Sequence, residues 1–190
     1  MPDFDPRQTA VLSMDLQNGI VSRLLKDDDA MLTRARGVLD RARAEGCLVV
    51  HVHVGFRPGF PEISARNALF GAIKRSPDYQ KMFEGGGAAI HSLVAPQGRD
   101  VVVQKHRVSA FAGTDLDQIL RANDIRTLVM FGIATSGVVL STLLEASDRD
   151  YEVVVVGDCC FDGEADLHRA LIEKLFARRG KVIQAADFAR

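Results

Sequence analysis

Two charged side chains interrupt apolar segments of this sequence and could handle protons. Asp15 directly follows the run TAVLSM, and Lys105 follows the run VVVQ. A carboxyl group at the end of a buried strand loses hydration, which raises its pKa unless a cation lies nearby. If both side chains reach one place, they form a pair suited to general acid–base chemistry. From position alone, Asp15 capping the next turn and Lys105 extending its ammonium to solvent remain open alternatives.

A glycine-containing stretch, GIATSGVV at residues 132–139, could hold a negative charge. It follows the apolar run TLVMF and precedes a helical pattern, so it is a strand-to-helix turn. Such a turn presents backbone N–H groups at the positive end of the helix dipole. We therefore expect Ala134, Thr135, Gly137 and Val138 to bind an oxyanion or a carboxylate. An ordinary loop is the alternative.

The cysteines do not form a disulfide pattern. Cys47, Cys159 and Cys160 are odd in number and two of them are adjacent, which favours a reducing, cytoplasmic location. Cys159 or Cys160 could act as a nucleophile at the end of a strand. Buried cysteines more commonly pack as small apolar residues, and we favour that interpretation.

Histidines at positions 51 and 53 raise the question of a metal site. On a strand, His51 and His53 face the same side and could bind zinc. The preceding residues, Val49 and Val50, supply no carboxylate ligand. We therefore favour packing roles for both histidines and predict neither a metal nor another cofactor.

The order of apolar runs predicts the fold. Short segments rich in Val, Leu and Ile are typical of strands buried on both faces of a parallel sheet. Amphipathic stretches between them have helical spacing, and Gly46 and Gly180 end two of these stretches. This order predicts one α/β domain over residues 1–190, a three-layer αβα sandwich with right-handed crossovers. The predicted strands are 9–14, 47–54, 100–104, 127–131, 152–156 and 181–184, and the predicted helices are 30–45, one from Leu116, 140–147 and 166–177.

These elements bring the chemical groups together. In an open parallel sheet, ligands bind beyond the carboxyl ends of the strands, where the strand order reverses. Asp15, Lys105, the 132–139 turn and Asp158 all follow predicted strands, so we expect them at one edge of the sheet. The connection at residues 55–98 is long, which indicates either a functional segment or a surface excursion with one helix near residues 66–75.

Composition limits the partners. The chain has 24 basic and 25 acidic residues, so its charge gives no reason to expect binding to nucleic acid or to an anionic membrane. No run approaches the roughly 20 apolar residues of a membrane span. A small-molecule substrate is therefore the expected partner.

Four stretches, in this order, resemble the isochorismatase-like superfamily, also called the cysteine hydrolase family. They are AVLSMDLQNGIV, VVQKHRVSAFAGTDLDQILRANDI, FGIATSGVVLSTLLEASDRDY and VVVVGDCCFDGEADLHRALIEKL. The resemblance implies a Rossmann-like, six-stranded parallel sheet of order 3-2-1-4-5-6. It also implies a cis peptide at 133–134, catalytic roles for Asp15 and Lys105, and a homo-oligomer, either a dimer or a tetramer.

One position departs from the family. The pattern Gly-x-x-Thr-x-x-Cys-Val aligns its nucleophilic cysteine with Val138, and a valine forms no thioester. Isochorismatases in this superfamily also lack the cysteine, although the GIATSGVV turn differs from theirs. The resemblance therefore implies a hydrolase that acts on a small polar or carboxylate substrate by non-covalent acid catalysis.

Further residues and a second function complete the expectations. We expect Gln17, Phe56 and Phe111 to line the pocket, with core packing as the alternative for both phenylalanines. The alternative function is a catalytically inactive family member that binds a small carboxylate or serves as an assembly subunit. Retention of Asp15 and Lys105 argues against this alternative, because buried charges without a use are costly.

Overall fold

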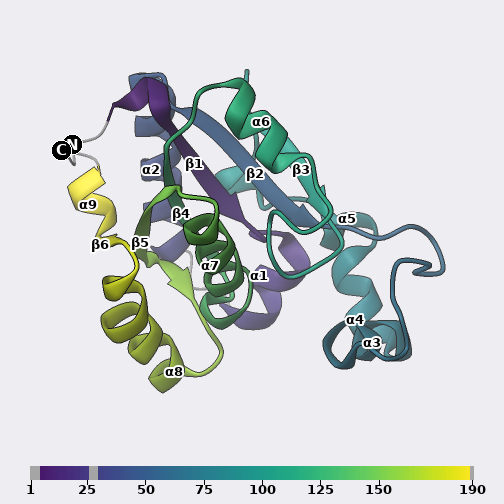
Figure 1. Ribbon diagram of the computed structural model, residues 1–190. Helices are drawn as coiled ribbons and strands as arrows, with labels where there is room; N and C mark the ends of the chain where they lie inside the picture. The colour runs from purple at the N-terminus through teal and green to yellow at the C-terminus, as the bar shows by residue number, and fades with distance from the viewer. Residues whose placement is uncertain (1–4, 26–29, 189–190) are drawn as a thin grey trace.

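One parallel sheet organises the chain, as predicted. The computed structural model describes residues 5–25 and 30–188. Six strands pair in the order β3-β2-β1-β4-β5-β6, which confirms the α/β fold class (Figure 1). Since the order reverses between β1 and β4, the carboxyl ends of these strands border the expected ligand site. The strands are β1 (Thr9–Met14), β2 (Leu48–Val54), β3 (Val101–Lys105), β4 (Thr127–Ile133), β5 (Glu152–Phe161) and β6 (Lys181–Ile183).

Helices cover both faces of the sheet. In Figure 1, α2 (Ala30–Glu45) lies behind the strands, whereas α6 (Leu116–Ala122) and α7 (Leu140–Asp148) lie in front of them. The apolar residues of α2 recur at helical spacing and are buried, and Gly46 follows the helix at a φ of 81°. A left-handed residue after a helix is a common helix end, and glycine adopts it without strain. Three short helices complete the main body: α1 (Asn18–Leu24), α8 (Ala165–Ala170) and α9 (Ala185–Phe188).

Most elements lie within one or two residues of their predicted bounds, and two differ by more. Strand β5 continues to Phe161, five residues beyond the predicted end, because it resumes pairing with β4 after a register shift between Met130 and Gly132. Asp158 therefore lies within β5, where its carboxylate accepts a hydrogen bond from the amide of Ala185 at 2.7 Å. The predicted helix at 166–177 is instead α8 followed by a π-helical segment, Leu171–Leu175, and a short 3-10 turn.

The long connection between β2 and β3 forms a small helical unit beside the sheet (Figure 1). It contains α3 (Ala68–Arg75), α4 (Pro77–Gln80) and α5 (Gly85–Ala88) rather than the single predicted helix. Phe60, Ile63, Phe70 and Ile73 bury their side chains in a separate apolar cluster within this unit. Within the described residues, no helix has the length and apolar character needed to cross a membrane.

Candidate active site

Asp15 and Lys105 meet at the carboxyl edge of the sheet. Asp15 follows β1 at a φ of 57°, a left-handed conformation that aspartate tolerates better than most residues, and its amide donates to the carbonyl of Val52. Lys105 is the last residue of β3 and pairs in register with Val54. Its Nζ lies 2.9 Å from Oδ2 of Asp15, across the end of β2. The expectation that groups at the carboxyl ends of the strands meet at one edge of the sheet therefore located a pair of opposite charges.

This pair is almost fully removed from solvent. Asp15 is 5 % exposed and Lys105 is 1 % exposed. Lys105 Nζ also donates to the carbonyl of Arg107 at 3.0 Å, whereas Oδ1 of Asp15 is buried without a hydrogen-bond partner. Burial raises the pKa of Asp15, and the Lys105 ammonium opposes that rise. A carboxyl group with a raised pKa and one unused oxygen is suited to proton transfer.

The turn after β4 lies beside β1, because Gly132 pairs in register with Met14. The Ile133–Ala134 peptide is cis, as the family resemblance implies. A π-helical turn, Thr135–Val139, follows, and the amides of Gly137 and Val139 both donate to the carbonyl of Ala134. The buried Val138 is part of this turn. The predicted binding turn therefore exists as one compact segment at the same edge of the sheet as Asp15.

Two residues after β5 hold the turn, and neither was predicted to do so. Thr135 Oγ1 lies 2.8 Å from Nδ1 of His168 on α8. Asp162 accepts a hydrogen bond from the amide of Ser136 at 2.7 Å. The pattern around His168 gave no sign of this contact. Asp162 was missed because β5 was expected to end earlier, so Asp158 was taken as the acidic residue that follows the strand.

Gln17 ties the helical unit to the sheet. Its Nε2 donates to the carbonyls of Val54 and Ala88, both at 2.9 Å, and its Oε1 accepts from the amide of Val54 at 2.8 Å. These bonds occupy the whole amide group and fix the positions where β2 ends and α5 ends. Pocket lining by Gln17 stays a prediction, and the observed contacts are structural.

The two phenylalanines expected at the pocket lie in different surroundings. Phe56 follows β2 and lies 6.1 Å, between ring centroids, from His106, the residue after Lys105. It also lines a hollow of about 280 Å³ with residues that include Phe60 and Glu84. Phe111 stacks on Tyr151 at 6.0 Å and belongs to the main core cluster. These contacts place Phe56 beside the residue that follows Lys105 and Phe111 in the main core cluster, and pocket lining by either side chain stays a prediction.

No thiol near the strand ends has the properties of a nucleophile. Cys159 is fully buried and Cys160 is 6 % exposed. Burial raises the pKa of Cys159 far above its usual range and that of Cys160 to about 12. Because the reactive form is the thiolate, these raised pKa values argue against nucleophilic catalysis by either side chain. The packing interpretation of these cysteines fits this environment.

The histidines of β2 have separate partners. Nε2 of His51 lies 3.0 Å from Oδ2 of Asp100, a carboxylate distant in sequence. Burial lowers the pKa of His53, and the positive charge of nearby Lys105 lowers it further. Across the part of the chain that the structure describes, no three side chains of His, Cys, Asp or Glu are grouped to hold a metal ion.

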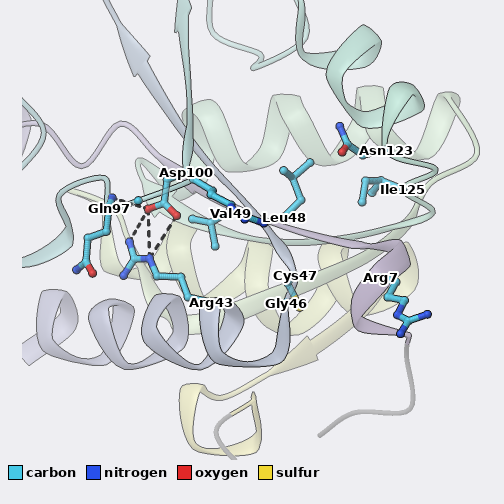
Figure 2. Close-up of a pocket in the computed structure, with 12 residues that line it drawn as sticks. Arg7, Arg43, Gly46, Cys47, Leu48, Val49, Gln97, Asp100, Asn123 and Ile125 are labelled. Carbon is cyan, nitrogen blue, oxygen red and sulfur yellow. Dashed lines mark hydrogen bonds and ion pairs between the residues drawn. The ribbon is translucent and has the colours of Figure 1, made fainter.

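A larger hollow, of about 610 Å³, lies at the opposite end of the sheet (Figure 2). Its walls come from the segments before β1, β2, β3 and β4, and include Arg7, Cys47 and Asn123. Figure 2 shows Arg43 directed onto Asp100, and their shortest N–O distance is 2.7 Å. Burial also raises the pKa of the Cys47 thiol to about 11. Because the half-buried Arg43 is paired and the pKa of the Cys47 thiol is raised, we favour Asp15 and Lys105 over this hollow as the candidate site.

Comparisons with known proteins agree with this fold. The family model described as "Isochorismatase domain" matches residues 9–187. The chain is 31% identical over 159 residues to maleamate amidohydrolase of Pseudomonas putida, covering 83% of this chain and 72% of that protein. It is 32% identical to ureidoacrylate amidohydrolase RutB of Acinetobacter baylyi, covering 96% and 83% of the two chains. An isochorismatase family protein from Burkholderia thailandensis superposes with a TM-score of 0.83 at 31% identity, covering 98% of this chain and 96% of that one.

Proposed function

Because the chain belongs to the isochorismatase family, we propose that this member is a hydrolase that uses Asp15 and Lys105 without a covalent intermediate. The observation that carries the proposal is the buried pair itself, with Nζ and Oδ2 at 2.9 Å and Oδ1 of Asp15 unbonded. A buried carboxyl oxygen without a hydrogen bond lowers folding stability, so we expect the protein to keep it because it has a use. Proton transfer to and from a substrate is such a use.

The proposed reaction needs one acid and one water molecule. In its protonated form, which burial favours and the Lys105 ammonium opposes, Asp15 gives its proton to the leaving group as the bond to that group breaks. Water adds at the carbon that loses the leaving group, and the proton that this water releases returns to the Asp15 carboxylate. The Lys105 ammonium stabilises the negative charge that develops during these steps.

Val138 supports a route without a thioester. It stands where the family pattern has its nucleophilic cysteine, and its side chain cannot attack a carbonyl. The thiols of Cys159 and Cys160 are buried and have raised pKa values, so neither is a suitable replacement. Direct attack by water is the remaining simple mechanism for hydrolysis at this edge of the sheet.

The substrate class follows from the relatives and from the turn. The relatives' names denote an amide and a ureide, and each of these compounds carries a carboxylate. Backbone amides at a strand-to-helix turn favour a carboxylate ligand. Since the amides of Ser136, Gly137 and Val139 already donate within the protein, those of Thr135 and Val138 are the candidates for this contact. We propose a small substrate with a carboxylate that the turn binds and a polar bond that lies against Asp15.

A hydrolysis panel tests this function. Maleamate, ureidoacrylate and a carboxylate-bearing vinyl ether are incubated with wild type and with Asp15→Asn, and product is followed by chromatography. We expect wild type to hydrolyse one of them and Asp15→Asn to lose at least about 100-fold in kcat, the typical contribution of a general acid. Absence of turnover by wild type, or full activity of Asp15→Asn, would contradict the proposal and favour an inactive binding protein.

Val138→Cys is a companion variant. It places a thiol in the turn without altering Asp15 or Lys105. If the other site residues act as they do in the family, this variant gains the ability to hydrolyse the amide. Iodoacetamide should block this gained activity. Wild type should resist iodoacetamide, because its three cysteines are buried. Inactivation of wild type by the reagent would instead indicate catalysis through a thiol.

A further inference from the structure

Two side chains that are not part of the Asp15–Lys105 pair contact the 132–139 turn. Thr135, which is 0 % exposed, opens the turn, and its hydroxyl lies 2.8 Å from Nδ1 of His168. The amide of the next residue, Ser136, donates to Oδ2 of Asp162 at 2.7 Å. Asp162 directly follows β5, and His168 lies on α8. Two consecutive residues of the turn are thus fixed by side chains that contact neither Asp15 nor Lys105.

We propose that His168 and Asp162 are positioning residues that set the conformation of the turn for substrate binding, which rests on the proposed hydrolase function. The role of His168 depends on chemistry that few side chains share. A hydroxyl both donates and accepts, and an imidazole nitrogen accepts when the proton is on the other nitrogen. With the proton on Nε2, Nδ1 accepts from Thr135 and sets the direction of the hydroxyl.

We expect these two residues to affect the rate of hydrolysis rather than the stability of the whole fold. Val138 and the amides proposed to bind the substrate are within four residues of Thr135. Misplacing a binding group by about 1 Å can cost about 100-fold in rate, even when the altered residue is remote from the reaction. His168 is only half-buried and lies on a six-residue helix, so its loss leaves the main core intact.

Substitutions separate positioning from folding. We expect His168→Ala to lower kcat by about 10- to 100-fold, for the panel compound that wild type hydrolyses fastest, with little change in thermal midpoint. His168→Asn places a polar group near the position of Nδ1 and should restore most of the activity. Arg169→Ala on the same helix is the matched control, since Arg169 is exposed, forms an ion pair with the exposed Asp166 and should leave activity unchanged when replaced.

A double-mutant cycle tests the contact itself. Thr135→Val removes the hydroxyl at nearly constant volume. If His168 acts through that hydroxyl, the double variant Thr135→Val/His168→Ala loses no more activity than either single variant. Additive losses, or an unrescued loss in His168→Asn equal to that of His168→Ala, would overturn the proposed role of His168.

An NMR arm does not depend on catalysis. Amide shifts of residues 134–139 should move in His168→Ala and in Asp162→Ala, return toward wild type in His168→Asn, and stay unchanged in Arg169→Ala. The His168 Nδ1 nitrogen shift should be that of an acceptor in wild type and change in Thr135→Val. If the turn shifts do not respond, the positioning proposal fails. If they respond while no panel compound is hydrolysed, the hydrolase function fails and the positioning of the turn stands.

Discussion

At the scale of single residues, the ionisation of Asp15 depends on two opposing influences. Burial raises the pKa of this carboxyl group, whereas the ammonium of Lys105, 2.9 Å away, lowers it. The balance matters because a general acid works best when its pKa lies near the working pH. Lys105 therefore acts on the reaction in two ways, by stabilising developing negative charge and by limiting the pKa of the acid.

Lys105→Met should separate these two effects. The variant keeps a side chain of similar length and removes the charge, so the pKa of Asp15 should rise further. Because protonated Asp15 is the active form, the alkaline fall in kcat should move to higher pH, while the maximal rate decreases. Rate measurements over a pH series check this expectation. A fall that moves to lower pH would indicate that Asp15 acts in its ionised form.

At the scale of elements, close contact between β1 and β4 requires the glycine at position 132. Its φ is 150°, and a Cβ atom there would overlap the carbonyl oxygen of Met14. This glycine lets the last residues of β4 approach β1, and it begins the 132–139 turn beside the strand that Asp15 follows. Local backbone freedom thus sets the distance between two parts of the candidate site.

Gly132→Ala should destabilise the fold by about 3 kcal/mol, because the new methyl group meets backbone rather than a flexible side chain. Gly37→Ala is the matched control, since Gly37 lies in α2 and a methyl group there would meet no other atom within 4 Å. That change should stabilise the helix by up to about 1 kcal/mol. Urea unfolding of both variants measures the difference. If Gly132→Ala were as stable as Gly37→Ala, the close contact between β1 and β4 would not require a glycine at position 132.

The same elements show how far the sequence could lead. Asp15 and Lys105 were found because apolar runs mark strands, and parallel strands place their carboxyl ends at one edge. The predicted end of β5 was wrong because Gly157 and Asp158 interrupt the valine run. A local pattern does not reveal that the strand pairs again with β4, where Cys160 lies opposite Gly132. The Thr135–His168 contact was missed for a related reason. It joins residues 33 positions apart, and neither residue type is unusual at its own position.

At the scale of the whole molecule, a buried polar network closes the long connection between β2 and β3. Asp100, at its end, accepts hydrogen bonds from Arg43 on α2 and from the amide of Gln97, and contacts Nε2 of His51 on β2. Although burial raises the pKa of Asp100, the bond from Arg43 and those from Gln97 and His51 lower it on balance. The network therefore joins a helix, a strand and the returning chain through one carboxylate.

Asp100→Asn should change both the stability and its pH dependence. At neutral pH the variant should lose about 3 kcal/mol, because Arg43 and His51 lose their buried anion. In wild type, the lowered pKa of Asp100 adds stability above its ordinary pKa of 3.8, which disappears as pH falls below that value toward the folded pKa. The variant lacks this ionisation, so its stability should fall less steeply below about pH 4.

His51 provides an internal contrast in the same experiment. Burial lowers the pKa of His51, although Asp100 opposes this, so stability also falls as pH drops below the ordinary histidine pKa of 6.5. That loss should persist in Asp100→Asn, since the imidazole remains buried, and only the loss at lower pH should shrink. Asp166→Asn, which alters an exposed carboxylate, should reproduce the wild-type curve. Urea unfolding from pH 7 to pH 3 measures all three proteins, and an unchanged slope below pH 4 in Asp100→Asn would mean that other carboxylates control acid unfolding.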